Sequence, residues 1–291
     1  MPNNDNDASP KAIGEDVLWA MTEGVLDTLL LDHTTGRKIF WATHDYEAFG
    51  PAYDYHSPML PELITGEHEK VVRPRLLKSK ERQTDRSKDM AEVFTPSWIC
   101  NAQNNLVDEA WWAEDGKTWE DYVRSTRLEI TCGEAPYLVS RYDTTTGDPI
   151  ALQNRIGLLD RKLHIISENV ADEDEWLKWA KVAYQNTYGY EWQGDNLLLA
   201  RRALLFTFIE YYQAKFSKQP SLESIRSIAD TISWNLWQMD GLTGGIPGYV
   251  PQEKTGSSLF DDFFLPEPEH RYCRIFDWEK NEEVRFIDLI K

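Results

Sequence analysis

Beyond Thr95 the sequence alternates short apolar runs with longer amphipathic segments, and this alternation limits the fold more than any other feature. Apolar runs typical of short buried strands occur at Arg127 to Cys132, Tyr188 to Trp192 and Ile232 to Gln238. Apolar residues at helical spacing predict helices over residues 98–112, 172–186, 196–216 and 221–232. Strands that alternate with helices favour a parallel sheet with crossover connections. We therefore expect an α/β fold with a doubly wound sheet.

An N-terminal extension precedes this alternating pattern. Residues 1–12 are polar and rich in Asn and Asp, which predicts a disordered tail. Residues 13–90 form an N-terminal region, in which Val17 to Leu31 has helical apolar spacing and His33 to Gly36 is typical of a turn. Residues 67–89 are rich in Lys and Arg, and both a solvated loop and a phosphate-facing strip fit this composition.

The charge balance argues against one class of function. The chain carries 49 acidic against 31 basic residues, a formal net charge of −18. A protein that neutralises many phosphates normally has a basic face, so we do not expect this chain to bind duplex DNA alone. DNA is still compatible as a target where another polypeptide brings the basic groove.

Other features of the sequence indicate a cytoplasmic protein without a metal site. No apolar stretch approaches the roughly 18 residues of a membrane span, and the N-terminus lacks the basic and apolar regions of an export signal. The three cysteines are odd in number and far apart, as in proteins of reducing compartments. The six histidines lack metal-ligand spacing, so we expect no metal.

Three acidic residues stand at or near the ends of the predicted strands: Glu129, Glu191 and Asp240. In a doubly wound sheet, ligands bind at the carboxyl ends of the strands. An acid at the end of the second strand can accept from both ribose hydroxyl groups of a nucleoside cofactor. An acid after the third strand can accept from an adenine amino group. The pattern therefore predicts a nucleoside site at this edge.

The segments around these acids resemble N6-adenine DNA methyltransferases, of the type whose Phe-Thr-Pro motif comes first in the chain. The resemblance lies in four segments that follow one another in that family's order: Ala91 to Pro96, Leu128 to Leu138, Tyr188 to Arg201 and Trp234 to Leu242. It covers about half of the chain, and it implies a methyltransferase-like domain over residues 91–291. The implied fold is a Rossmann-like methyltransferase sheet.

The same resemblance implies that the chain binds S-adenosylmethionine. The contacts it implies are at Phe94, Thr95, Pro96, Glu129, Thr131, Cys132, Gly133, Glu191, Trp192, Asp240 and Leu242. In this assignment Thr95, Glu129 and the segment 131–133 hold the methionine end, and Glu191 holds the ribose. Asp240 and Leu242 contact the adenine, which Trp192 flanks.

The sequence departs from the family in two places. Ile130 stands where Pro is usual, and Glu134 and Ala135 replace a small residue and a second Gly, so that Glu134 is expected to crowd or repel the carboxylate of the cofactor. The second departure is an absence: these enzymes hold the flipped adenine with an Asn/Asp/Ser-Pro-Pro-aromatic tetrapeptide, and the chain contains no Pro-Pro dipeptide. We expect a sheet that is incomplete at its catalytic half, because the chain ends about where the fourth strand is due.

Three functions are compatible with these features. The first is the cofactor-binding subunit of a split adenine methyltransferase of a restriction-modification system, inactive alone. Its partner subunit carries the catalytic motif and the target-recognition region. The second is an inactive methyltransferase fold that serves as a scaffold or regulatory subunit, and the third is an acidic DNA mimic.

Overall fold

The computed structural model of the chain describes residues 24–74, 95–248 and 272–290. Its centre is a three-stranded parallel sheet in the order β3-β4-β5, formed by Arg127–Glu129, Thr187–Glu191 and Leu236–Gln238. Glu129 lies beside Gly189, and Glu191 lies beside Gln238. The chain therefore has a mixed α/β fold whose neighbouring parallel strands follow one another in sequence.

All three predicted strands are present, but two of them are shorter than predicted. β4 agrees with the prediction to within one residue at each end. β3 ends at Glu129, because the chain turns there and Thr131 takes a left-handed backbone with φ 47°. β5 begins at Leu236, and the predicted strand residues Ile232 to Asn235 are the last turn of a helix. That part of the strand prediction was wrong, because a short apolar run fits a buried strand and a buried helix face equally well.

The helices predicted for the central part of the chain are confirmed. The described ranges contain the α-helices α2 (Val25–Leu29), α4 (Ser97–Trp112), α5 (Trp119–Arg124), α6 (Leu158–Asn169), α7 (Glu173–Gln185), α8 (Gly194–Phe216), α9 (Leu222–Asn235) and α11 (Phe286–Leu289). Three of them, α5, α7 and α9, begin at side-chain caps. Asp172 accepts from the N–H of Glu175 at 3.0 Å, and Ser221 accepts from the N–H of Ser224 at 3.1 Å. Such caps satisfy N–H groups that have no partner inside the helix.

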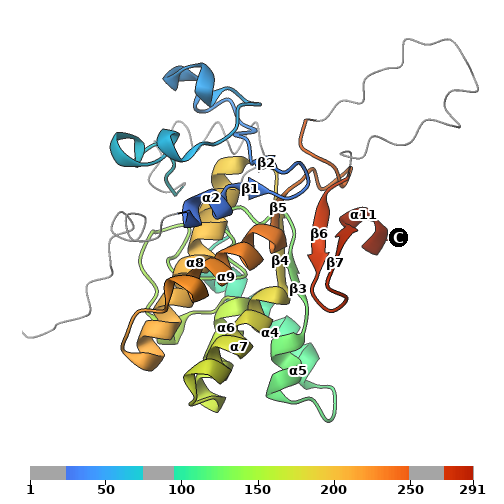
Figure 1. The fold of residues 1–291 in the computed structure, drawn as a ribbon. Coiled ribbons are helices and arrows are strands. Elements are labelled where there is room, and N and C mark those ends of the chain that lie inside the picture. Colours follow the sequence, from blue (N-terminus) through green and yellow to red (C-terminus); the bar gives the residue numbers. More distant parts are fainter. Residues whose placement is uncertain (1–23, 75–94, 249–271, 291) are drawn as a thin grey trace, which may run out of the picture.

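Helices α7, α8 and α9 and the C-terminal hairpin lie on opposite sides of the sheet (Figure 1). Helices α7, α8 and α9 contact β4, and α8 and α9 also contact β5. On the other side lie β6 (Arg274–Asp277) and β7 (Glu282–Arg285), which form an antiparallel pair followed by α11. A small apolar cluster joins this hairpin to the sheet, with Tyr190 and Trp237 from the strands and Ile275 from β6.

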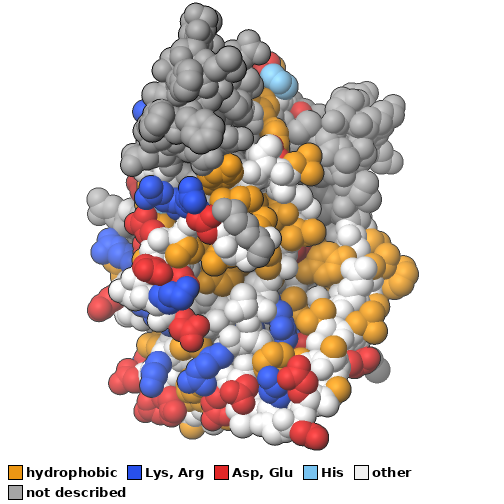
Figure 2. All heavy atoms as spheres, turned by 90° about the vertical axis from the view of Figure 1, so that its right-hand side faces the viewer, with side chains coloured by type: hydrophobic (Ala, Val, Ile, Leu, Met, Phe, Trp, Pro, Cys, Tyr) orange, Lys and Arg blue, Asp and Glu red, His pale blue; other side chains and the backbone are white. Residues whose placement is uncertain are grey.

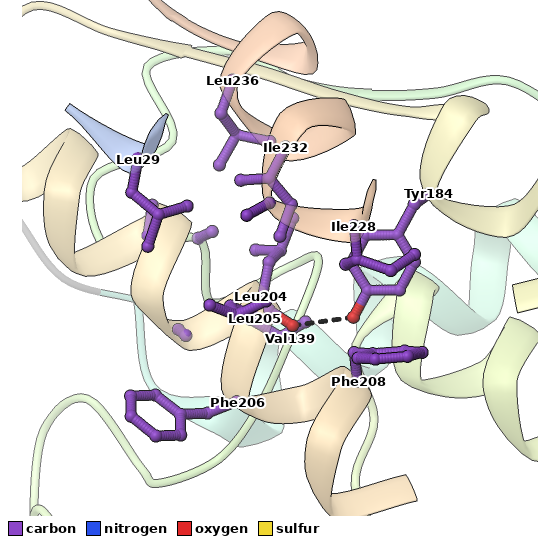
Figure 3. Packing of buried hydrophobic residues seen from close by; sticks show 14 of the residues in the cluster. Leu29, Val139, Tyr184, Leu204, Leu205, Phe206, Phe208, Ile228, Ile232 and Leu236 are labelled. Carbon is purple, nitrogen blue, oxygen red and sulfur yellow. Dashed lines mark hydrogen bonds between the residues drawn. The ribbon is translucent and has the colours of Figure 1, made fainter. Parts of the chain in front are cut away.

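The main core lies between the sheet and the helices (Figure 3). Leu204, Leu205 and Phe208 of α8 pack there against the buried face of α9. A polar group in this part of the core, the hydroxyl of Tyr184, donates to the backbone oxygen of Leu204 at 2.7 Å. Because this hydroxyl group has a hydrogen-bond partner, its burial avoids the cost in free energy of an unsatisfied polar group.

The N-terminal region shares this core. Its hairpin, β1 (Leu31–Asp32) and β2 (Arg37–Lys38), encloses the predicted turn at His33 to Gly36. The buried guanidinium of Arg201 donates to the backbone oxygens of Leu29 at 2.6 Å and of Leu236 at 2.6 and 2.9 Å. One side chain of α8 thus connects the N-terminal region to β5. Residues before Gly24 and the second half of the basic stretch lie outside the described residues.

Short 3-10 helices make up much of the remaining regular structure. They are η1 (Glu47–Phe49), η2 (Pro51–Tyr53), η3 (Pro61–Leu63), η4 (Gly66–His68) and η6 (Leu152–Asn154). None of the helices in the described ranges combines the length and the apolar character that a membrane span requires.

Candidate functional site

The three predicted acids lie at one edge of the sheet. Glu129 ends β3, Glu191 ends β4, and Asp240 follows the end of β5 by two residues. The N–H of Met239 donates to the backbone oxygen of Glu191 at 2.9 Å, so the chain just before Asp240 is still joined to β4. Because the strands are parallel, their carboxyl ends meet at the same edge, as the sequence predicted.

The carboxylates of Glu129 and Glu191 hold the loop that follows β3. Glu191 accepts from the N–H of Gly133 at 2.9 Å. Glu129 accepts from the N–H groups of Tyr137 at 3.3 Å and Leu138 at 3.1 Å. The loop 131–138, which resembles the first motif of the methyltransferases, is therefore fixed to the carboxyl ends of two strands.

The backbone of this loop is left-handed at three positions, where φ is 47° at Thr131, 54° at Gly133 and 61° at Ala135. Glycine adopts this conformation freely, whereas a residue with a Cβ atom loses about 1 to 2 kcal/mol in it. Ala135 stands where the family has its second Gly. The backbone at this position thus has the conformation for which a Gly would be suited.

Glu134, the other departure in this loop, is buried, with 4% of its surface exposed. Its carboxylate accepts a hydrogen bond from the hydroxyl of Tyr142. Burial first, and then the charge of Glu134, raise the pKa of Tyr142 well above its usual range, so Tyr142 is a stable donor. The expected crowding of a cofactor by Glu134 stays a prediction, but the side chain lies inside the protein and not on its surface.

Burial also decides the protonation state of Glu129. It raises the pKa of this carboxyl to about 8, and the negative charge of Glu191 adds to the increase. The hydrogen bonds from Tyr137 and Leu138 favour the ionised form, but they do not outweigh burial. Glu129 is therefore mostly protonated at neutral pH.

Cys132 has a packing role in the loop. It is buried, and a Cβ atom added at Gly189 would lie 3.3 Å from its sulfur. Burial raises the pKa of the thiol well above its usual range, so the sulfur is protonated and unreactive. The N–H of Cys132 donates to the backbone oxygen of Tyr190 at 2.8 Å and continues the pairing with β4 beyond Glu129.

The residues at the start of α4 contact the same loop. The backbone oxygen of Thr95 accepts from the hydroxyl of Thr144 at 2.9 Å, and Pro96 directly precedes the helix. Farther along α4, the amide of Asn104 donates to the backbone oxygen of Tyr137 at 3.0 Å. A side-chain hydrogen bond between Thr95 and Tyr137 brings the end of the Phe-Thr-Pro segment to the loop 131–138. Phe94 lies outside the described residues.

The N-terminal region contacts the carboxyl ends of β4 and β5, which the sequence did not predict. The side-chain amide of Gln238 accepts from the N–H of Phe40 at 3.1 Å and donates to the oxygens of Phe40 and Trp192 at 2.9 Å each. The indole N–H of Trp192 donates to the hydroxyl of Tyr55 at 2.9 Å. Gln238 could have been suspected from its place at a strand end. Tyr55 could not, because 137 residues separate it from Trp192.

Asp240 has local partners. Its carboxylate accepts from the N–H of Leu242 at 2.8 Å and from the hydroxyl of Thr243 at 2.9 Å, which forms a turn around Gly241. An added Cβ atom at Gly241 would lie 2.9 Å from the ring of Tyr190, so a larger residue there would require this ring to shift. The side chain of Leu242 is 99% exposed. An acid and an exposed apolar side chain therefore stand together past the end of β5.

A groove of about 650 Å³ lies elsewhere, between the sheet and the C-terminal hairpin. Its lining includes Leu128, Tyr188, Trp237, Phe276, Trp278 and Ile290. None of the three acids is among the described residues that line it. Figure 2 looks onto this side of the molecule, and hydrophobic side chains gather across the middle of the face. The groove and the acidic edge are thus two separate features.

Comparison with known proteins adds no relative: no protein-family model matches the chain, and neither a curated protein nor a solved structure is similar to it. In residues 24–74, 95–248 and 272–290, no three or more His, Cys, Asp or Glu side chains are grouped to hold a metal ion. The chemistry of the site follows from its own geometry. Carboxylates at neighbouring strand ends can accept hydrogen bonds from the hydroxyl and amino groups of a nucleoside.

Proposed function

We propose that this chain is the S-adenosylmethionine-binding subunit of a split N6-adenine DNA methyltransferase, with a doubly wound Rossmann-like sheet. One observation carries the proposal. Four segments that are far apart in sequence meet at the carboxyl edge of a parallel sheet, namely Thr95 and Pro96, the loop 131–138, Glu191 with Trp192, and Asp240 with Leu242. Nucleoside cofactors bind at this edge in such folds.

The residues present fit the parts of S-adenosylmethionine. Glu191 would accept from the ribose hydroxyl groups, and its bond to Gly133 is compatible with this role, because a carboxylate offers about four acceptor positions. Asp240 would accept from the adenine amino group, with Leu242 as the exposed apolar contact. Thr95 and the segment 131–133 would hold the methionine end. The bound cofactor supplies an activated methyl group, and these residues position it.

Glu129 has a different place in this proposal from the one expected at first. Its carboxyl is buried and bonded to the N–H groups of Tyr137 and Leu138. It would therefore shape the loop that receives the methionine end. In its neutral form it adds no negative charge beside the carboxylate of the cofactor.

The partner in this proposal supplies what the 291 residues lack. They contain no Pro-Pro dipeptide and carry a net charge of −18. A target adenine must leave the duplex and stack on an aromatic side chain before its amino group is methylated. The partner would bring the tetrapeptide that holds the flipped base, the target-recognition region and the basic groove for DNA, as in the modification arm of a restriction system.

A specific observation also favours a second candidate, a scaffold or regulatory subunit that has kept the fold without the cofactor. Glu129, Glu191 and Asp240 each have backbone partners inside the protein. These hydrogen bonds stabilise loops of the fold whether or not a cofactor binds, which is what a scaffold requires.

Titration calorimetry of the full chain with S-adenosylmethionine and with its demethylated product separates the two candidates. We expect the wild type to bind and Glu191→Gln to bind about tenfold or more weakly, since a charge-assisted hydrogen bond to ribose contributes about 1.5 to 3 kcal/mol. Glu168→Gln, at an exposed acid on α6, is the matched control and should bind as the wild type does. Thermal unfolding of each variant checks that the fold is kept. Absence of binding heat with the wild type would overturn the proposal and favour the scaffold.

A further inference from the structure

Among the residues that the structure describes, β3 is an edge strand whose outer edge is open. Within the described part of the chain, β4 is the only strand hydrogen-bonded to β3. The N–H of Arg127 donates to the backbone oxygen of Asn186 at 3.0 Å, so the hydrogen-bonding groups of Arg127 and Glu129 face β4. Those of Leu128, between them, point the opposite way, because successive residues of a parallel strand alternate in this respect.

The side chains along this edge do not protect it from pairing. Proteins usually guard open edge strands with charged residues, Pro or bulges. The exposed positions from Thr126 to Ile130 are Thr126, Leu128 and Ile130, which carry no charge, and Arg127 is partly buried. Leu128 is 42% exposed and Ile130 63%, high values for large aliphatic side chains. An open edge with exposed aliphatic side chains of this kind is typical of a strand that pairs in the working assembly.

The apolar surface continues from this edge into the groove beside it. Leu128 lines the groove together with Tyr188 and Trp237 on the sheet and Leu289 and Ile290 at the end of the chain. Leu289 is 52% exposed and Ile290 60%. Figure 2 shows several groups of hydrophobic side chains on this face. Exposed apolar side chains gathered in this way, with charged residues such as Arg124 and Glu279 at the groove, mark a site of interaction with another protein.

We propose that the open edge of β3 and the neighbouring groove are the docking surface for the partner subunit, which adds a parallel strand to β3 and places apolar side chains in the groove. This inference rests on the proposed function. A strand parallel to β3 has its carboxyl end at the same edge as Glu129 and Glu191. Residues at that end, the catalytic tetrapeptide, would then stand beside the candidate cofactor site. The net charge of −18 also suits a partner whose DNA-binding surface is basic.

The probe is the polypeptide encoded by the neighbouring reading frame that contains an Asn-Pro-Pro-aromatic or Asp-Pro-Pro-aromatic tetrapeptide. Its affinity for the full chain is measured by calorimetry with the wild type, with the double variant Leu128→Lys and Ile130→Lys, and with Leu222→Lys. Leu222 is also an exposed aliphatic residue, but it lies on α9, on the helix-covered side of the sheet. We expect the double variant to bind at least about tenfold more weakly and Leu222→Lys to bind as the wild type does. Both replaced side chains in the double variant are exposed, so the fold should be kept.

Hydrogen exchange gives a second, direct readout. The amide of Leu128 should exchange rapidly in the free chain and slowly in the complex, because a strand added to β3 would accept from it. Unchanged exchange at Leu128, full affinity of the double variant, or no complex with the wild type would each overturn the docking proposal. Light scattering of the chain alone tests for a second copy on this surface. A dimer that the double variant dissociates would overturn it as well.

These outcomes are separate from those of the cofactor titration. Leu128→Lys alone should still bind S-adenosylmethionine with wild-type affinity, since Leu128 precedes Glu129 in β3 and lines the groove. If the wild type forms the complex but does not bind the cofactor, the proposed function is rejected and the docking surface is kept. If it binds the cofactor but no strand pairs with β3, the docking surface is rejected and the proposed function is kept.

Discussion

Replacing Glu129 by Gln is expected to remove a pH dependence from the stability of the fold. The pKa of this carboxyl is raised from 4.5 to about 8 in the folded protein, mainly by burial. The folded state therefore holds the proton more tightly than the unfolded state does. The stabilisation this provides is fully present below about pH 4.5 and is lost as the pH rises through about 8.

The magnitude follows from the difference in bound protons. Where Glu129 is protonated in the folded state and ionised in the unfolded state, the free energy of unfolding falls by about 1.4 kcal/mol per pH unit. Between pH 5.5 and 7.5 the contribution of Glu129 thus decreases by about 2 to 3 kcal/mol. Other buried groups, such as His33 with its pKa lowered by burial to about 3, titrate alike in wild type and variant. The difference between the two proteins isolates Glu129.

Urea unfolding followed by tryptophan fluorescence at pH 5.5, 6.5 and 7.5 measures this difference. The stability of the wild type minus that of Glu129→Gln should fall steadily over the series. Asp160→Asn is the matched control, because burial raises the pKa of Asp160 only to about 6 and its contribution levels off above that pH. Parallel stability curves for wild type and Glu129→Gln would refute the reasoning, since they would mean that Glu129 is ionised and hydrated at neutral pH.

Two further predictions concern the backbone. Ala135→Gly and Ala229→Gly each delete a buried methyl group, worth about 0.8 kcal/mol, but at Ala135 the change relieves about 1 to 2 kcal/mol of left-handed strain. We expect the free energy of unfolding, measured with urea, to fall by about 2 kcal/mol in Ala229→Gly, which lies inside a helix, and to stay within about 1 kcal/mol of wild type in Ala135→Gly. Equal decreases in the two variants would argue against the left-handed loop. An added Cβ atom at Gly194 would lie 2.1 Å from the backbone oxygen of Phe40, so Gly194→Ala should cost about 2 kcal/mol or more. An unchanged melting temperature would show that the N-terminal region does not pack at the start of α8.

Much of the fold could be predicted because its signals are local. The amphipathic spacing of α7 and α9 and the polar caps at Asp172 and Ser221 depend only on nearby residues. The predicted strand over Ile232 to Gln238 was wrong in its first half because local signals alone were used there too. Four residues, of which only Ile232 and Trp234 are apolar, do not tell a helix end from a strand start, and only the packing of Ile232 in the helical core decides between them.

The position of the three acids could also be predicted, because parallel strands bring their carboxyl ends to one edge whatever the details of packing. The contacts of these acids could not. The bonds of Glu129 to Tyr137 and Leu138 depend on how the loop returns over the sheet. Its raised pKa depends on burial by residues from several elements.

The sequence by itself determined the order of the three parallel strands and of α4, α7, α8 and α9, the acids at the strand ends and the absence of a Pro-Pro dipeptide, because these are properties of local pattern and composition. Only the tertiary structure decided that Phe40 and Tyr55 reach the ends of β5 and β4, that Glu134 is buried against Tyr142, and that the outer edge of β3 is open among the described residues. The physical reason is that hydrogen bonds, burial and free strand edges depend on which distant segments meet. That is settled by packing in three dimensions.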